Sequence, residues 1–459
     1  MWSYVKSKRC DQVSIPSLEA NVTTVSNAQG KAELINQQFT SVFTHENTST
    51  LPDLGASPFN TIVVDNINAG GVAKFLADLQ GHKAHGPDGI LARLLKETAY
   101  DMVPLLTHIY KASLHQCRLP HDWKTVLVSP IYKKGSCKSP ANYRPISLTS
   151  IPCKILEHLI YSSVYNHLEA NSILCDAQHG FRKNRSCETQ LIITINEIAS
   201  RLNLGEQVDV LSLDFSKAFN RVPHEHLFHK LSYYGIRGTY LEWIKVFLTD
   251  REQQVIIDNK FSVPSTVISG VPQGSVLGPL LFQLFINDPN DIESLVKLYA
   301  DDVLVMRSII TPNDHQTLQN DLTKLTLWSA TWQMPFNLAK CEHLIVTNKP
   351  HPSIHHYKIN DYTIQKVESI KYLGLTISHN LSWLPHISRI VGKVNSVQAF
   401  FRRNLAYCSR DLKVKCYTKH IFDRLLNTLA LCGPHIHRVV FMPLKCSNGR
   451  QPDLFVVIL

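Results

Sequence analysis

The sequence lacks the long apolar runs that a secretory leader or a membrane span would need. The first nine residues, Met1 to Arg9, contain no apolar stretch, and no later run approaches the length that crosses a bilayer. The 11 cysteines are odd in number and have no repeated spacing, which argues for reduced thiols and against a disulfide scaffold. We therefore expect an intracellular protein that is neither secreted nor bound to a membrane.

Tandem repeats and low-complexity tracts are also missing, which excludes solenoids and disordered chains. The 459 residues are 44% hydrophobic and 18% charged, as expected for two or three globular domains with real cores. The net charge is +10 and the pI is about 9.0. This surplus suggests a polyanionic partner, nucleic acid first, although a basic but otherwise ordinary enzyme explains the charge equally well.

Two adjacent carboxylates, Asp301 and Asp302, lie between the apolar runs 295–296 and 303–305. β-Branched and aliphatic residues on both sides favour two strands, and aspartate favours the turn between them. Hard divalent cations prefer carboxylate oxygens. Taken alone, however, a solvated Asp-Asp hairpin turn is commoner than a metal site.

A third carboxylate, Asp214, closes the apolar stretch 208–215, which has the pattern of a buried strand. An aspartate in this place is either a helix cap or a ligand. Three carboxylates brought together by the fold would repel one another unless divalent cations neutralised them. Two such cations can activate a hydroxyl and stabilise a leaving pyrophosphate.

Basic residues gather at two other places. A strand over 123–135 and its return over 142–148 predict a hairpin with Lys133 and Arg144 near its end, where they could hold a triphosphate or simply be solvated. Further on, Phe181 lies beside Arg182 and Arg185. These three residues could stack on a base and grip phosphates, or they could be a core ring beside a basic helix start.

Periodicity and turn chemistry predict the remaining elements. A turn-rich connector covers residues 1 to about 60, and a glycine- and proline-rich loop, which lets backbone approach a ligand closely, covers 270–279. Helices are expected at 31–42, 91–96, 103–114, 154–168, 187–202, 224–234, 240–249, 280–286, 317–332, 393–403 and 412–421. Further strands are expected at 255–257, 266–268, 344–346 and 371–377.

Seven blocks of the chain carry a resemblance to a known family. They are, in order, residues 86–89 (Gly-Pro-Asp-Gly), 142–148 (Asn-Tyr-Arg-Pro-Ile-Ser-Leu), 178–182 (Gln-His-Gly-Phe-Arg), 213–219 (Leu-Asp-Phe-Ser-Lys-Ala-Phe), 270–275 (Gly-Val-Pro-Gln-Gly-Ser), 299–302 (Tyr-Ala-Asp-Asp) and 372–374 (Tyr-Leu-Gly). In this order and over roughly residues 80 to 420, they resemble the reverse transcriptases of non-LTR (LINE, jockey-like) retrotransposons.

The resemblance implies an α+β right-hand polymerase with an antiparallel palm sheet. Its expected parts are an N-terminal extension or connector (1–80), fingers (81–205), palm (206–378), a partial thumb (379–425) and an atypical tail (426–459). The expected partners are an RNA template, a DNA primer and deoxynucleoside triphosphates, in the nucleus or the cytoplasm. Protein partners are not predicted.

The resemblance also implies roles for individual residues. Asp214, Asp301 and Asp302 match the palm aspartates that bind two Mg²⁺ ions, for which Mn²⁺ can substitute. The other matches are to nucleotide-binding residues (Lys133, Arg144, Phe219, Gln273, Gly274) and a proton donor to pyrophosphate (Lys340). Phe181, Arg182 and Arg185 remain nucleic-acid-binding candidates on their residue types alone. Phe219 matches an aromatic gate against a ribose 2′-hydroxyl, and a core aromatic is its plainer interpretation.

The chain departs from the family pattern at three places. Asn220 replaces the usual aspartate after Ala218 and Phe219; we expect this position to support the site without binding metal. The residues before 80 are too few for the endonuclease that the family usually carries. The tail contains four residues of types that bind zinc, but their spacing fits no standard zinc motif; they are Cys432, His435, His437 and Cys446. We expect instead a frame shift near residues 421–425, testable by translating the genomic DNA in the other two frames.

The sequence therefore predicts an RNA-directed DNA polymerase that extends a primer 3′-hydroxyl by two-metal phosphoryl transfer. The alternative, from a different class, is a catalytically impaired nucleic-acid-binding remnant of a retroelement. An RNA-dependent RNA polymerase is disfavoured by Tyr299 and Ala300 before the aspartates and by Phe219 at the gate position.

Overall fold

The computed structural model describes residues 15–20, 23–49, 51–64, 67–288, 291–405, 408–409 and 411–412, and two strands in the tail, β17 (Val439–Leu444) and β18 (Asp453–Ile458). The expected helix at 412–421 lies, apart from its first residue, outside the described part of the chain. Cys432, His435, His437 and Cys446 lie outside it as well.

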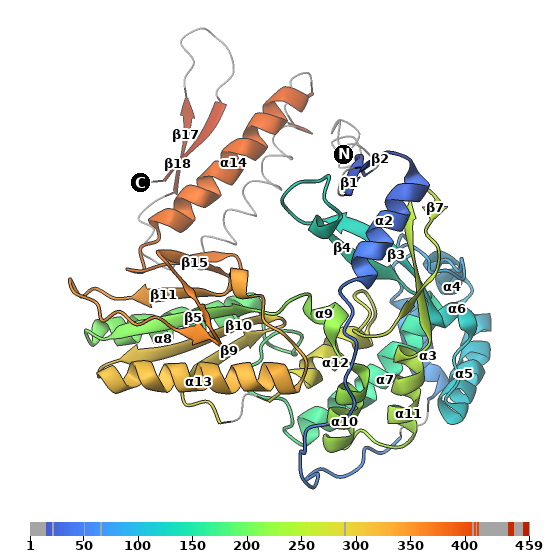
Figure 1. Ribbon diagram of the computed structural model, residues 1–459. Coiled ribbons are helices and arrows are strands. Elements are labelled where there is room, and N and C mark those ends of the chain that lie inside the picture. The colour runs from blue at the N-terminus through green and yellow to red at the C-terminus, as the bar shows by residue number, and fades with distance from the viewer. Residues whose placement is uncertain are drawn as a thin grey trace.

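A five-stranded sheet, called here the central sheet, organises the molecule (Figure 1). Its strand order is β14 (Gln365–Val367), β11 (Glu342–Val346), β5 (Gln207–Asp214), β10 (Asp302–Ile309) and β9 (Leu295–Tyr299). The pairs around β5 and β10 are antiparallel, as predicted, while β14 joins β11 in parallel. The sheet is therefore mixed at one edge.

Apolar side chains alternate between the two faces of the central sheet, which is why both faces are covered. One face packs against α8 (Cys187–Asn203) and the hairpin of β15 (Ser369–Tyr372) and β16 (Leu375–Ser378). The opposite face belongs to the main core, which includes buried leucines of α13 (Pro312–Thr331) (Figure 1). Burial of each such leucine stabilises the fold by about 2 kcal/mol.

A second sheet contains β4 (Tyr143–Leu148), β3 (Thr125–Tyr132), β6 (Arg251–Ile257) and β7 (Lys260–Phe261), and β8 (Ser265–Val267) also pairs with β6. The predicted hairpin of β3 and β4 is confirmed, with Ile131 opposite Arg144. Helix α2 (Ala28–Thr40) matches the predicted helix at 31–42. Its residues Ile35 and Phe39 share a buried cluster with strands of this sheet.

Helices form most of the rest of the molecule, and most of them contribute to the main core. They are α3 (Ala69–Ala77), α4 (Ala92–Glu97), α5 (Ala99–Gln116), α6 (His121–Lys124), α7 (Ile151–Ala170), α9 (Ala218–Arg221), α10 (His224–Tyr233), α11 (Thr239–Leu248), α12 (Leu277–Phe285) and two 3₁₀ turns, η1 (Pro140–Asn142) and η2 (Leu338–Lys340). Short strand pairs are β1 (Leu18–Ala20) with β2 (Thr23–Val25), and β12 (Lys358–Ile359) with β13 (Tyr362–Thr363). None of the described helices is long and apolar enough to cross a membrane.

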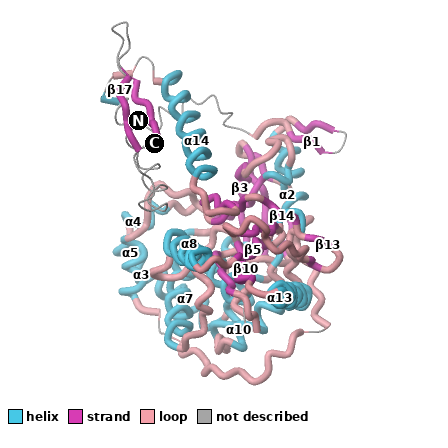
Figure 2. Tube along the Cα trace, turned by 90° about the vertical axis from the view of Figure 1, so that its left-hand side faces the viewer, coloured by secondary structure: helices cyan, strands magenta, loops and turns pink. Residues whose placement is uncertain are grey.

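Helix α14 (Leu384–Asn404) extends away from the central sheet (Figure 2). It includes the predicted basic helix at 393–403 and begins nine residues earlier. Its buried side chains, among them Ile390, Val394 and Phe401, form a small cluster separate from the main core.

The prediction of one strand over 371–377 was wrong. The chain turns at Leu373 and Gly374, whose φ angles are 45° and 90°, and the two halves pair as β15 and β16. Two central residues with positive φ make the tight turn that matches the twist of a two-stranded hairpin. The glycine at the second position was the available signal.

Candidate active site

The ends of β5 and β10 bring Asp214 and Asp302 together. In the antiparallel register Asp302 is the direct partner of Asp214, and directly opposed residues point to the same face of a sheet. Asp301 lies in the turn before β10, next to Ala300, whose φ is 53°. An alanine in this left-handed region costs about 1 kcal/mol. The predicted turn is confirmed, with Asp302 already the first residue of a strand.

The three carboxylates lie close enough to affect one another. Burial first, and then the negative charges of Asp301 and Asp214, raise the pKa of Asp302 from its ordinary value to about 6. Positive charges at Lys133 and Arg144 act in the opposite direction. This crowding is the electrostatic condition under which a cation is bound.

Four basic side chains surround this end of the sheet. The Nζ of Lys340, on η2, donates to Oδ2 of Asp214 at 2.6 Å. Burial, followed by repulsion from Arg144 and Lys340, lowers the pKa of Lys133. Burial, followed by repulsion from Lys340 and Arg144, lowers that of Lys217. Three of these cations were predicted; Lys217 was missed, although it stands three residues after Asp214.

The donor set suits a hard divalent cation, because carboxylate oxygens are what such ions prefer. Within the described residues, however, no three Asp, Glu, His or Cys side chains converge as a complete metal site. Mg²⁺ commonly takes only one or two carboxylates and completes its shell with substrate phosphates and water. The site therefore fits a cation that arrives with a phosphorylated substrate better than a permanent structural ion.

Phe219, in α9, stacks on Phe282 of α12 with ring centroids 4.6 Å apart. Phe181 meets Phe219 edge-on at 6.3 Å and is 46% exposed. Phe219 is half-buried, so it is anchored by the core while one part of the ring is free. Both interpretations of Phe219, gate and core aromatic, fit this position.

The loop 270–276 is fastened to the second sheet and to α7. The amide of Ser147 donates to the carbonyl of Gln273 at 2.8 Å. A Cβ at Gly274 would lie 2.5 Å from the carbonyl oxygen of Ser147, so only glycine fits there. The buried carboxylate of Glu157, which the sequence analysis missed, accepts from the amides of Val276 and Leu277 at 2.7 and 3.0 Å.

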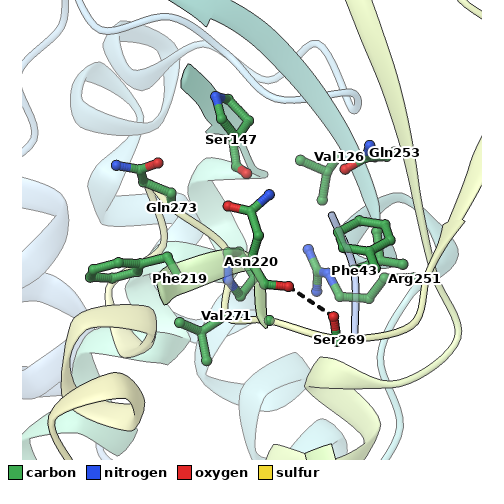
Figure 3. Close-up of a pocket in the computed structure, with 14 residues that line it drawn as sticks. Phe43, Val126, Ser147, Phe219, Asn220, Arg251, Gln253, Ser269, Val271 and Gln273 are labelled. Atoms are coloured by element: carbon green, nitrogen blue, oxygen red, sulfur yellow. Dashed lines mark hydrogen bonds between the residues drawn. The ribbon is translucent and has the colours of Figure 1, made fainter. Parts of the chain in front are cut away.

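Asn220 lines a small cavity of about 40 Å³ behind this loop. Its side chain points toward Ser147, and its carbonyl accepts from the Ser269 hydroxyl at 2.8 Å (Figure 3). Phe219 and Gln273 lie on the left of the same view, on the side of Asn220 away from Ser269. A cavity of this size holds one or two waters.

Arg182 and Arg185 direct their guanidinium groups inward. Arg182 donates to the carbonyl of Cys175 at 3.0 Å and its side chain is 11% exposed. Arg185 donates to the carbonyl and to Oδ1 of Asp176 at 2.6 and 2.7 Å. Their first contacts are therefore with their own loop, whereas Phe181 stays available to a ligand.

Comparison with known proteins agrees with this geometry. Residues 131–377 match the family model described as reverse transcriptase (RNA-dependent DNA polymerase). Similar proteins of Drosophila melanogaster include the probable RNA-directed DNA polymerase from transposon BS (29% identical; 84% of this chain, 45% of that protein). Two others are those from transposon X-element (30%; 70% and 36%) and from mobile element jockey (28%; 73% and 38%).

The chain spans less than half the length of these relatives. The family match nevertheless covers more than half of this chain and includes all three aspartates, Lys133, Arg144 and the loop 270–276. The chain belongs to the reverse transcriptase family, whose members are RNA-directed DNA polymerases, and within it resembles the enzymes of jockey-like non-LTR retrotransposons.

Proposed function

We propose that this chain extends a DNA primer on an RNA template, adding deoxynucleotides by phosphoryl transfer at Asp214, Asp301 and Asp302. The observation that carries the proposal is the strand register that sets Asp214 opposite Asp302, with Asp301 in the adjoining turn. A phosphoryl-transfer site needs positioning and charge neutralisation more than a covalent nucleophile. Carboxylates faced by several cations meet that need.

Each group has a proposed part in the reaction. The primer 3′-oxygen bonds to the α-phosphorus of the incoming nucleotide, and the bond from that phosphorus to the β-phosphate oxygen breaks. Lys133 and Arg144 hold the triphosphate. Lys340 gives a proton to the leaving pyrophosphate. Two Mg²⁺ ions, held by the three aspartates and replaceable by Mn²⁺, would activate the 3′-hydroxyl and neutralise the developing charge.

The surrounding elements have proposed parts as well. Gln273 and Gly274 pack on the nucleotide and template, while Phe219 lies under the sugar and rejects a 2′-hydroxyl. Phe181 stacks on a base, and Arg182 and Arg185 grip phosphates of the nucleic acid. In the right-hand arrangement the fingers are 81–205, the palm 206–378 and the partial thumb 379–425. The protein acts inside the cell, in the nucleus or the cytoplasm.

Primer extension with purified protein tests the proposal. A DNA primer on an RNA template should grow by dNTPs, and rNTPs should be used poorly because of Phe219. Replacing Phe219 by valine should relax that discrimination by about tenfold or more, a loss of roughly 1.4 kcal/mol. Absence of dNTP incorporation by folded protein that binds template would overturn the proposed polymerase activity.

A second candidate is an impaired nucleic-acid-binding remnant of a retroelement. Asn220 favours it, because this amide lacks the charge that the family usually has at this position. The remnant would bind a primed RNA template as tightly as an active enzyme does and incorporate no nucleotide.

A further inference from the structure

We propose that Gln178 is the positioning residue of the Asp301–Asp302 turn. Its side chain fastens the turn to a loop from a distant part of the chain and so fixes where the two carboxylates stand. The consequence for catalysis rests on the proposed function, whereas the consequence for the turn itself does not.

The loop first covers the free edge of the central sheet. Strand β9 is the last strand of that sheet, and its outer side is paired by residues 177–179. The amide of Leu298 donates to the carbonyl of Ala177, and the amide of His179 donates to the carbonyl of Leu298, each at 2.9 Å. These two bonds make a short parallel bridge between Gln178 and Leu298.

The Gln178 side chain then reaches past the end of β9 into the turn. Its Oε1 accepts from the amide of Ala300 at 3.1 Å and from the amide of Gly180 at 2.7 Å. The side chain is only 2% exposed. Its Nε2 has no hydrogen-bond partner in the part of the chain that the structure describes, so the oxygen makes both contacts with the turn and the loop.

Ala300 is the residue of the turn that most needs support. It holds a positive φ of 53°, which an alanine adopts only when its surroundings enforce it. The backbone next to it is equally restricted, because a Cβ at Gly180 would lie 2.4 Å from the Ala300 nitrogen. The turn and the loop therefore approach each other so closely that only glycine fits at position 180.

The loop that supports the turn is itself held by hydrogen bonds to other parts of the protein. Asn287 accepts from the amide of Cys175 at 2.8 Å and donates to the carbonyl of Ile173 at 2.7 Å. Arg185 donates to the carbonyl of Gln178 itself at 3.2 Å. The bond from Arg185 therefore helps to fix the loop that supports the Asp301–Asp302 turn, a role that its basic character alone did not predict.

Replacing Gln178 by methionine tests the proposal, because methionine keeps the length of the side chain and removes the accepting oxygen. Gln207→Met is the matched control. Gln207 is also buried, also accepts a backbone amide (that of Ser353, at 2.8 Å), and lies at the opposite end of the β5–β10 pair. Both variants should lose stability; only Gln178→Met should disturb the turn.

The first measurement is amide hydrogen exchange, which requires no activity. In Gln178→Met the amides of Ala300 and Gly180 should exchange about tenfold faster or more, and in Gln207→Met they should keep the wild-type rate. Unchanged protection of Ala300 in Gln178→Met would overturn the proposal, whether or not the protein polymerises.

The second measurement is the Mg²⁺ concentration that gives half-maximal dNTP incorporation. It should rise about fivefold in Gln178→Met, with a maximal rate about tenfold lower. A smaller folded fraction lowers the rate but leaves the half-maximal Mg²⁺ concentration unchanged, as expected for Gln207→Met. A wild-type protein without activity would refute the proposed function, while the exchange result would still decide the role of Gln178.

Discussion

Strand β5 carries one aspartate near each end, and the two carboxylates have opposite surroundings. Asp209 is fully buried. It accepts from Gln207 Nε2 and from the Tyr357 hydroxyl, each at 2.8 Å, and ring nitrogens of His315 and His343 lie 3.4 Å away. Both oxygens of the Asp209 carboxylate therefore accept hydrogen bonds from groups inside the protein.

Asp214, five residues later on the same strand, is 30% exposed and meets Lys340 and the like charge of Asp302. The fold gains little from such an arrangement, because like charges repel and an exposed ion pair contributes at most about 1 kcal/mol. The comparison shows that residue type and strand position alone do not separate a carboxylate that is fully bonded inside the protein from a candidate ligand. Unused bonding capacity beside further carboxylates marks Asp214 as the candidate.

The largest expected effects come from replacing the aspartate at each end of β5 by asparagine. Asp214→Asn should lower dNTP incorporation by about 10³-fold or more, since it removes a metal ligand, and should change the free energy of unfolding by less than about 1 kcal/mol. Asp209→Asn should do the reverse, costing about 2 kcal/mol of stability through lost charge-assisted hydrogen bonds while activity per folded molecule stays near wild type. Denaturant unfolding and primer extension measure both. Equal loss of activity in the two variants would break the comparison.

Lys340 is the cation that distinguishes the Asp214 end. Lys340→Met should lower the maximal rate of incorporation by about 10²-fold, because proton donation to the leaving group is lost. Lys366→Met, at an exposed position of β14, is the control and should have the wild-type rate. A wild-type rate in Lys340→Met would remove Lys340 from the mechanism.

The pH dependence of metal binding should follow Asp302. Its pKa, raised to about 6, means that the folded protein holds a proton there at acid pH, and that this group stabilises the metal-free fold less as pH rises through about 6. Mg²⁺ must displace that proton. The rise in thermal midpoint on adding Mg²⁺ should therefore be smaller at about pH 5 than at about pH 8. Asp302→Asn should show no such difference, and an equal rise at both pH values in the wild type would contradict the assignment.

The smallest expected effect concerns Asn220. Restoring the family's usual residue with Asn220→Asp should raise incorporation about threefold, equivalent to roughly 0.7 kcal/mol, because it places a charged acceptor in the cavity behind the loop 270–276. Primer extension at saturating dNTP measures this change. An unchanged or lower rate would mean that Asn220 does not impair the chain, and would weaken the remnant hypothesis.

The sequence predicted the elements of the site well, because each has a local pattern. The apolar strand before Asp214, the turn at Asp301 and the basic hairpin all depend on neighbouring residues. Lys133 and Arg144 were visible as the basic end of that hairpin, whereas Lys340 could be predicted only through the resemblance to a family. The tertiary register that pairs Asp214 with Asp302 depends on long-range packing, which no local pattern contains.

Other features could not be predicted for the same reason. The contacts of Arg182 and Arg185 with their own loop were not predicted, since a basic run gives no sign of which carbonyls will face it once the loop folds. Gln178 was visible as part of a family block, but its bond to Ala300 joins residues far apart in sequence. The buried network of Asp209 was missed because an aspartate inside an apolar strand does not reveal its partners.

The most direct test is incorporation of a single dNTP into a DNA primer on an RNA template, with equal amounts of template-bound wild-type and Asp301→Asn protein. The predicted result is incorporation by the wild type and none above background by the variant. Incorporation by Asp301→Asn at the wild-type rate would contradict the assignment of the β5–β10 end of the central sheet as the catalytic site.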